Sequence, residues 1–304
     1  MSHCRVTWVY RAVLAELWLL LVSQNRRSLH RCPTRRIRNN FLPTWRSLGQ
    51  RHSTNRHRCG QVVATVVSLP DATTRILPSS ACLCPGNIYA WCRWADDLAD
   101  ETRDPELGLD LLGWWQRELL ACYQGSVRHP VMVALRETVD RFSIPRDPFL
   151  DLLTAFRQDQ RVVRYETFEE LLDYCRHSAN PVGRLILFLG RCHMPERVLL
   201  SDQICTGLQL VNFWQDVAQD YDRGRIYIPR TESRRVGYSE EMFARREFNP
   251  AFRTLMKGLV NEAAAFLRRG RPLVAMMPRK LQVPIYLFVR GGLSIAQAIE
   301  KVDY

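Results

Sequence analysis

From about residue 88 to the C-terminus, hydrophobic residues recur at the three- to four-residue spacing of amphipathic helices. Proline and glycine separate the periodic segments, and no run of alternating β-branched residues indicates a strand. The pattern therefore predicts an all-α domain. We expect its helices over residues 88–101, 107–124, 130–141, 147–161, 167–191 with an internal break, 196–222, 239–247, 250–269 and 281–300.

The internal break is predicted within LLDYCRHSANPVGRLILFLG, where Asn180, Pro181 and Gly183 interrupt the helical pattern. The proline ring disfavours helical angles in the residue that precedes it, and proline lacks the N–H that a helix interior requires. We therefore expect a kink or break at this point. The pattern alone fits either a kink that serves helix packing or a break whose small residues leave room beside the helix.

The positive charge of the chain is concentrated at its N-terminus. Residues 1–86 contain 13 arginines, no lysine and two acidic residues, so they carry +11 of the total net charge of +12. The remainder is close to neutral and 46% of the whole chain is hydrophobic, which fits a folded body with a sizeable core. A nucleic-acid-binding body needs its charge clustered on a folded face, so we expect no such function for the body.

The N-terminal segment also differs from the rest in its pattern. Its apolar stretch, AVLAELWLLLV at 12–22, is too short to span a bilayer. A signal sequence and an Arg-rich targeting peptide are two interpretations. We favour a third: residues 1–86 form a poorly ordered leader outside the folded protein, produced by a wrongly chosen start or a reading-frame error. The helical domain would then comprise residues 87–304.

Several kinds of site are not indicated by the sequence. The ten cysteines are dispersed, with no C-x-x-C pair, which predicts buried reduced thiols in a cytoplasmic protein. No glycine-rich loop follows a strand, so neither a Rossmann fingerprint nor a P-loop is present and no nicotinamide site is expected. His129, His177 and His193 have no partner at metal-ligand spacing, and we interpret them as structural or surface residues.

The segment IYAWCRWADDLADE, residues 88–101, places four acidic side chains within six positions. At about 100° per residue, Tyr89, Arg93, Asp96 and Asp100 fall within an arc of roughly 60° on one helix face. Asp97 lies roughly 60° further round and can reach the same ligand. The alternatives are a solvated acidic face and, for Arg93, an ion pair with Asp96 or Asp97.

About 120 residues later, the segment GLQLVNFWQDVAQDYDRGRIYIP carries Asn212, Asp216 and Asp220 at positions i, i+4 and i+8. The other positions of this predicted helix are almost all apolar, which indicates burial. Buried carboxylates repel one another and each costs several kcal/mol unless cations neutralise them. Oxygen ligands alone favour Mg²⁺, which usually completes its coordination shell with water and substrate phosphates. The sequence therefore predicts a magnesium site and a phosphate or diphosphate substrate.

At these residues the chain resembles the squalene and phytoene synthases, and the resemblance extends from about residue 87 to the C-terminus. It includes YAWCRWADDLAD, YCRHSANPVGRL, QLVNFWQDVAQDYDRGRIYIP and VPIYLFVRGGLSIAQAIEKV. The resemblance implies an isoprenoid-synthase-type helical bundle around a central cavity, a Mg²⁺ cofactor and a prenyl diphosphate substrate. SANPVGRL with NFWQDV is most similar to the bacterial hopanoid branch, which converts presqualene diphosphate to hydroxysqualene for a separate reductase. Sister branches make presqualene diphosphate, squalene or phytoene.

The resemblance also implies roles for individual residues. Asp96 and Asp100 on one helix and Asp216 and Asp220 on another would be the catalytic Mg²⁺ ligands, facing each other across the cavity. The substrate-binding residues would fall into two groups, with Arg93, Asp97, Gln209, Asn212 and Arg225 at the diphosphate and carboxylates, and Tyr89, Tyr174 and Tyr286 near the reacting carbons. For the tyrosines, ordinary core packing is the alternative. Asn180 would hold a water, or would simply mark the kink.

Two features depart from the family pattern. Residues 60–86 do not resemble the upstream diphosphate-binding helix of the family, and Gln215 stands where the family often has arginine. The rival hypothesis from another class is a non-catalytic helical protein whose basic leader attaches it to a membrane or to nucleic acid, with binding that weakens steeply in salt. For the enzyme, we expect a cytoplasmic location with peripheral membrane contact, other enzymes of the pathway as partners, and no nucleic acid.

Overall fold

The computed structural model describes residues 83–100, 102 and 104–304, so most of the predicted leader lies outside the described residues. Within these residues every regular element is an α-helix, which confirms the all-α prediction, and one isolated β-bridge joins Arg164 to Ile226. The helices are α4 (Leu83–Asp100), α5 (Pro105–Tyr123), α6 (Pro130–Phe142), α7 (Asp147–Asp159), α8 (Phe168–Ser178), α9 (Asn180–Leu189), α10 (Pro195–Gln215), α11 (Val217–Asp222), α12 (Arg230–Arg235), α13 (Glu240–Arg245), α14 (Pro250–Gly270), α15 (Leu273–Met276) and α16 (Arg279–Lys301).

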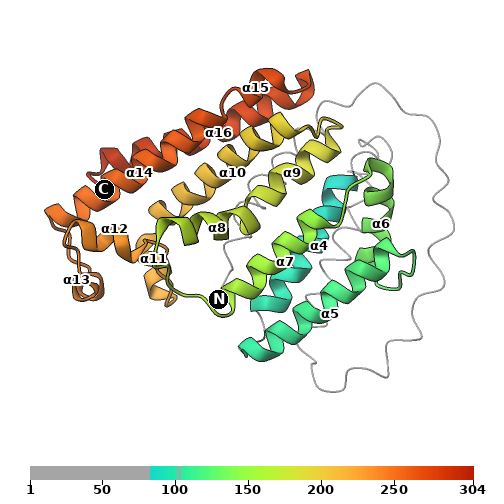
Figure 1. Ribbon diagram of the computed structural model, residues 1–304, viewed down its shortest axis with the longest axis horizontal. Coiled ribbons are helices and arrows are strands. Elements are labelled where there is room, and N and C mark those ends of the chain that lie inside the picture. The colour runs from blue at the N-terminus through green and yellow to red at the C-terminus, as the bar shows by residue number, and fades with distance from the viewer. Residues whose placement is uncertain (1–82, 101, 103) are drawn as a thin grey trace, which may run out of the picture.

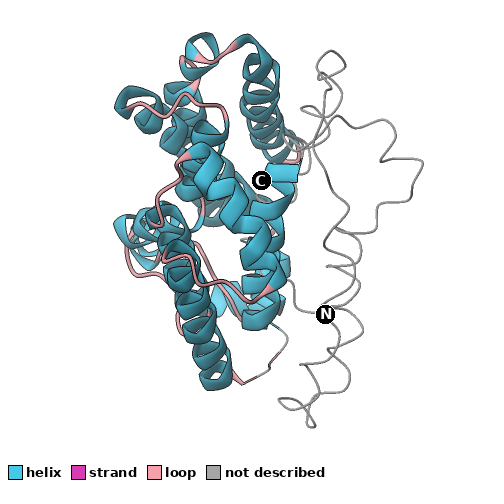
Figure 2. Ribbon diagram, turned by 90° about the vertical axis from the view of Figure 1, so that its right-hand side faces the viewer, coloured by secondary structure: helices cyan, strands magenta, loops and turns pink. Residues whose placement is uncertain are grey.

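The long helices lie side by side across the molecule (Figures 1 and 2). Helix α10 packs against α14 and α16 on one side and against α8 and α9 on the other. Helix α7 contacts α8 and α9 and also α4, which in turn packs against α5 and α6. The two helices that carry the acidic motifs, α4 and α10, are therefore connected through α7 and α8.

Most helix starts follow from local chemistry. Asp104, Thr167, Ser239 and Asn249 are N-cap residues whose side chains accept a hydrogen bond from a backbone N–H in the first turn. Proline occupies an early position in α5, α6, α10 and α14, where its fixed φ fits a helix and its missing N–H has no intrahelical partner to lose. These residues explain why helix boundaries predicted from the sequence lie close to those observed.

The predicted break near Asn180 is confirmed: α8 ends at Ser178, Ala179 lies between the helices at φ −114°, and α9 begins at Asn180. A second break was not predicted. The expected continuous helix over 196–222 is divided into α10 and α11 at Asp216, whose φ of −112° and ψ of 21° lie outside the helical range. The short helices α12 and α15 were also not predicted.

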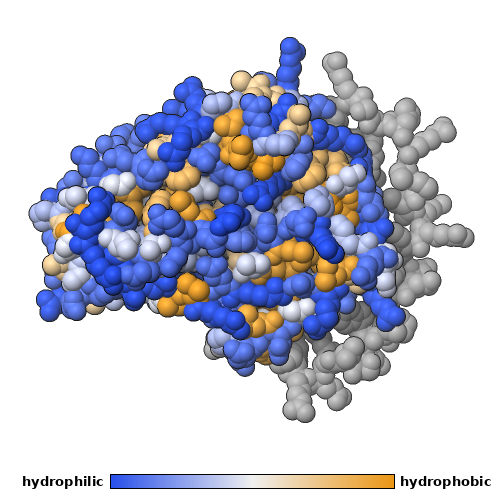
Figure 3. All heavy atoms as spheres, viewed as in Figure 1, coloured by the Kyte–Doolittle hydropathy of each residue, from blue (hydrophilic) through white to orange (hydrophobic). Residues whose placement is uncertain are grey.

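The core combines aromatic and aliphatic side chains from nearly all helices. Trp91 of α4 lies 6.3 Å from Trp115 of α5 and 4.9 Å from Phe149 of α7, measured between ring centroids, and thereby joins these three helices. The cysteines among the described residues are buried, as predicted. On the face in Figure 3, hydrophobic residues gather only in small separate patches. No described helix has both the length and the apolar character to cross a membrane.

Candidate active site

The first acidic motif lies in the second half of α4. Arg93 Nη1 is 3.0 Å from Asp96 Oδ2, and Arg93 Nη2 is 2.5 Å from Asp97 Oδ1. Asp96 is buried, with 2% of its surface exposed, whereas Asp97 and Arg93 are partly buried. The ion pairs considered as the alternative for Arg93 are thus both present, and they fix the orientation of two of the predicted carboxylates.

The charged residues of α4 shift the pKa of Arg93. Burial lowers the pKa of this guanidinium, but the neighbouring charges of Asp97 and Asp96 outweigh burial, so the net shift is upward. Tyr89 lies one helical turn before Arg93 and packs against the core while remaining partly exposed. Asp100 is the last residue of α4, and its side chain lies outside the described part of the structure. Three of the four residues on the predicted face can therefore be placed.

The second acidic motif spans the α10–α11 junction. Asp216 separates the helices, yet its N–H donates to Asn212 O at 3.2 Å and Asp220 N–H donates to Asp216 O at 2.9 Å. These i to i−4 hydrogen bonds keep the polypeptide on nearly the same course, so the polar stripe survives the break. Asp220 is 3% exposed, whereas Asp216 and Asn212 are partly exposed. The buried carboxylate of this motif is therefore that of Asp220.

The loop after α11 places Arg225 beside this motif. Arg225 N–H donates to Asp220 O at 2.9 Å, and its Nη2 donates to Asp159 O at the end of α7, at 3.3 Å. A small cavity of about 10 Å³, lined in part by Asp220, Arg225 and Tyr227, lies at this point. That volume corresponds to about one water molecule. Arg225 is therefore held beside the second motif, and its predicted contact with the diphosphate or the carboxylates stays a prediction.

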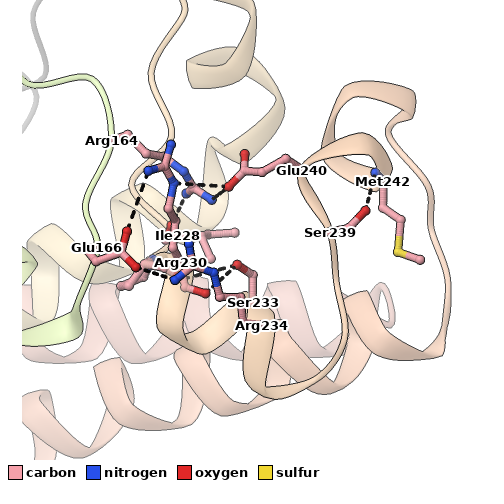
Figure 4. A network of polar contacts seen from close by, with 10 residues as sticks. Arg164, Glu166, Ile228, Arg230, Ser233, Arg234, Ser239, Glu240 and Met242 are labelled. Atoms are coloured by element: carbon pink, nitrogen blue, oxygen red, sulfur yellow. Dashed lines mark hydrogen bonds and ion pairs between the residues drawn. The ribbon is translucent and has the colours of Figure 1, made fainter.

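A polar network holds the loop containing residues 226–228 against residues 163–166 (Figure 4). Ile226 N–H donates to Val163 O at 2.9 Å, and Arg164 donates through Nη1 to Ile228 O. Arg164 Nη2 also pairs with Glu240 Oε1 at 2.7 Å, which ties the loop to α13. Because Val163 and Arg164 hold this loop at two points and α13 in turn holds Arg164, the side chains that the loop presents to the interior are held in place.

Four buried rings form an aromatic wall, and they come from this loop, from residues 163–166, from α8 and from α10. Phe213 stacks on Tyr227 with 3.9 Å between ring centroids, and Tyr174 lies 6.2 Å from Phe213. Tyr165 stacks on Tyr227 at 5.9 Å. Burial, with a smaller contribution from the charge of Asp159, raises the pKa of the Tyr165 phenol, so this residue remains neutral. Ring faces of this kind stabilise a nearby cation.

Sequence reasoning found Tyr174 but not Tyr165, Phe213 or Tyr227. Tyr227 and Phe213 lie within the second acidic motif, but nothing in the sequence distinguishes them from the other apolar residues of that segment. Tyr165 lies in a non-helical segment with no periodicity to indicate its burial. Tyr286 of α16 is 43% exposed, and no contact in the described structure joins it to the aromatic wall.

Gln209 of α10 is 1% exposed, and neither atom of its side-chain amide has a hydrogen-bond partner among the described residues. It lies one turn before Phe213 and Asn212 on α10 and therefore on the face that carries the second motif. Buried amides are normally hydrogen-bonded. The ligand-binding role assigned to Gln209 from the sequence stays a prediction.

A larger cavity, of about 290 Å³, lies beside the second motif without including its carboxylates. Trp214, Gln215 and Tyr221 line it together with aromatic residues of α13 and α14. Gln215, the departure from the family pattern, thus faces this cavity. None of the predicted acidic residues lines it, so it is distinct from the predicted metal site.

Among the residues that the structure describes, no three His, Cys, Asp or Glu side chains lie close enough to share one metal ion. Mg²⁺ is usually bound by one or two carboxylates together with water and substrate phosphates. The donors at both motifs are oxygens, and Asp96 and Asp220 are buried carboxylates. The residues present therefore fit Mg²⁺.

The part of the chain that the structure describes is thus an all-α bundle with one acidic motif on α4, a second at the α10–α11 junction, and buried aromatic rings beside the second motif. The family model for squalene/phytoene synthase matches residues 72–304, and the chain belongs to this family. Its members are prenyltransferase-type enzymes that act on prenyl diphosphates. The match and helix α4 both begin upstream of the domain boundary predicted at residue 87.

Individual relatives refine this placement. The chain is 38% identical over 191 residues to hydroxysqualene synthase of Rhodopseudomonas palustris, covering 62% of this chain and 64% of that protein. It is 27% identical over 271 residues to chloroplastic phytoene synthase of Daucus carota, covering 86% of this chain and 67% of that protein. The chain thus spans about two thirds of the length of these curated relatives.

Among solved structures, the squalene synthase HpnC from Alicyclobacillus acidocaldarius superposes with a TM-score of 0.72 at 34% identity. The superposition covers 82% of this chain and 94% of that one. The similarity therefore extends over nearly the whole of the HpnC fold.

Proposed function

We propose that this protein ionises presqualene diphosphate in a Mg²⁺-dependent reaction and quenches the resulting cation with water to form hydroxysqualene. The observation that carries the proposal is the agreement of two comparisons, with a hydroxysqualene synthase at 38% identity and with the HpnC structure at 34% identity. The motifs that suggested the hopanoid branch from sequence, SANPVGRL and NFWQDV, lie on neighbouring helices.

In this proposal Asp96, Asp100, Asp216 and Asp220 hold Mg²⁺ together with the substrate diphosphate. When bound, Mg²⁺ supplies positive charge that makes the diphosphate a better leaving group. Arg93 keeps Asp96 and Asp97 oriented through its two ion pairs. Arg225, held against Asp159 and Asp220, adds a fixed positive charge on the side of the second motif.

Departure of the diphosphate leaves a cyclopropylcarbinyl cation, which no protein nucleophile needs to attack. The wall of Tyr165, Tyr174, Phe213 and Tyr227 would stabilise such a cation by about 0.5–2 kcal/mol for each well-placed ring. The same buried rings exclude water from most of the reacting carbons. A single positioned water then completes the reaction.

A second candidate within the family is head-to-head prenyl transfer that yields presqualene diphosphate, squalene or phytoene. It is favoured by the phytoene synthases, which match this chain over a larger share of its length at lower identity. The alternative of a non-catalytic helical protein with a basic leader predicts no Mg²⁺ dependence and binding that weakens steeply with salt. Peripheral membrane contact and a cytoplasmic location remain predictions.

A substrate-choice assay separates these candidates. Purified protein receives presqualene diphosphate, farnesyl diphosphate or geranylgeranyl diphosphate, each with Mg²⁺ and with EDTA, and no nicotinamide. We expect Mg²⁺-dependent consumption of presqualene diphosphate in preference to the other two. Preferential use of farnesyl or geranylgeranyl diphosphate would assign the chain to a sister branch, and consumption that EDTA leaves unchanged would contradict the metal site.

A further inference from the structure

Two buried polar side chains in the α8–α10 interface have no hydrogen-bond partner within the described part of the chain. They are the Ser178 hydroxyl and the Gln209 amide, and each residue is 1% exposed. Buried hydroxyl and amide groups are nearly always hydrogen-bonded to protein or to an ordered water. Each of the two groups can therefore take a hydrogen bond from a small polar ligand such as a water molecule.

The helix register places the two groups opposite each other. Tyr174 of α8 lies 6.2 Å from Phe213 of α10, measured between ring centroids. Further along, Thr206 Oγ1 of α10 donates to Asn180 Oδ1 at 3.0 Å. As the residue number rises along α8 and α9 it falls along α10, so these helices run antiparallel.

Ser178 lies one helical turn after Tyr174, and Gln209 lies one turn before Phe213. Residues four apart share a helix face. Because Tyr174 and Phe213 are already in contact, the antiparallel register brings Ser178 opposite Gln209. The pair lies between the aromatic contact and the Asn180–Thr206 hydrogen bond, next to the wall proposed to surround the cation.

We propose that Ser178 and Gln209 together hold the water molecule that attacks the rearranged cation. The inference rests on the proposed function and assigns its last step to these two residues. The serine hydroxyl and the glutamine amide can each donate and accept, so together they can satisfy several of the hydrogen bonds of one water and fix its orientation. Asn180 has its carbonyl oxygen engaged by Thr206 and supports the register instead.

The chemistry balances without a redox partner. Ionisation breaks the substrate C–O bond, and its electron pair leaves with the diphosphate. The bound water then forms a new C–O bond to the rearranged carbon cation and loses one proton, which the released diphosphate accepts. Neither Ser178 nor Gln209 acts as a base; they are positioning residues that determine whether the cation meets water or loses a proton to become an alkene.

The test is the division of products from presqualene diphosphate in wild-type protein and in Ser178→Ala. We expect the ratio of alcohol to alkene products to fall about tenfold, while the rate of diphosphate release changes by less than about threefold, because only the positioning of the water is lost. Ser201→Ala is the matched control, since Ser201 is also a buried serine, and it faces Gly183 of α9 from α10. The control should keep the wild-type ratio.

An unchanged ratio in Ser178→Ala would overturn the proposal, and so would a parallel loss of alcohol and of diphosphate release. An equal change in Ser201→Ala would show that general packing of the interface controls the products, and it would overturn the proposal too. Ser178→Cys, which nearly preserves the side-chain volume, gives the same measurement if the alanine variant does not fold. The wild-type sample distinguishes failure of this inference from failure of the proposed function, because absence of hydroxysqualene in that sample contradicts the proposed function itself.

Discussion

Replacing Gly207 by alanine tests the close packing that positions α10, the helix that carries Gln209 and the second acidic motif. A Cβ at residue 207 would lie 2.8 Å from Leu267 Cγ and 3.0 Å from the Leu267 backbone N of α14. Ordinary carbon contacts are about 3.5–4.0 Å, so the methyl would be about 0.7 Å too close. The Leu267 side chain can rotate, but its backbone N can move only with α14.

The magnitude follows from two opposing effects. Overpacking a core typically costs about 1–3 kcal/mol, while glycine to alanine in a helix interior contributes about 1 kcal/mol of stability. Because the Leu267 backbone is one of the atoms that must move, we expect a cost of about 2–3 kcal/mol and thus a net loss of about 1–2 kcal/mol for Gly207→Ala, which lowers the melting temperature by about 2–8 °C.

Thermal unfolding followed by circular dichroism measures this change, and Gly258→Ala of α14 is the control. A Cβ at residue 258 would meet only Arg235 Nη2, at 3.8 Å. That variant gains the helix propensity without the clash and should raise the melting temperature by about 2–4 °C. The packing argument is refuted if Gly207→Ala melts at or above the wild-type temperature.

Two further changes test the site and the surrounding core. Asp96→Asn should reduce Mg²⁺-dependent release of diphosphate about a hundredfold or more, with the exposed Asp110→Asn as control, and equal activity of the two variants would contradict the assignment of Asp96. Burial lowers the pKa of His129 from 6.5 to about 4, because the folded protein holds this imidazole in its neutral form. The unfolding free energy should therefore be highest above pH 6.5 and should fall by about 3 kcal/mol in total as the pH drops from 6.5 toward 4. His129→Asn keeps a capping side chain for α6 and should weaken this dependence in denaturant titrations; an identical pH profile would exclude His129 as its source.

The helices were largely predictable because their signals are local. Capping residues such as Asp104 and Asn249 and early prolines mark helix starts in the sequence itself. The break at Asp216 was not predictable in the same way, since the hydrophobic periodicity continues through it and its i to i−4 hydrogen bonds persist. Only the backbone angles of one residue change.

The site was predictable where it lies on helix faces and not where it depends on distant segments. Helical spacing in the sequence indicated the acidic motifs that contain Asp96 and Asp220. Tyr165 joins the aromatic wall because Arg164 and its neighbours bind a loop more than sixty residues away, a contact that no local pattern records. The opposition of Ser178 and Gln209 likewise depends on the register of two helices.

The most direct test of the central claim is the mass of the product formed from presqualene diphosphate in water enriched in oxygen-18. If a carbon cation is quenched by water, the alcohol carries the heavy isotope and its mass increases by about 2 units. We predict labelled hydroxysqualene that requires Mg²⁺. An unlabelled alcohol would mean that the bond broken is P–O rather than C–O, and exclusively hydrocarbon products would mean that no water is admitted; either result would contradict the account.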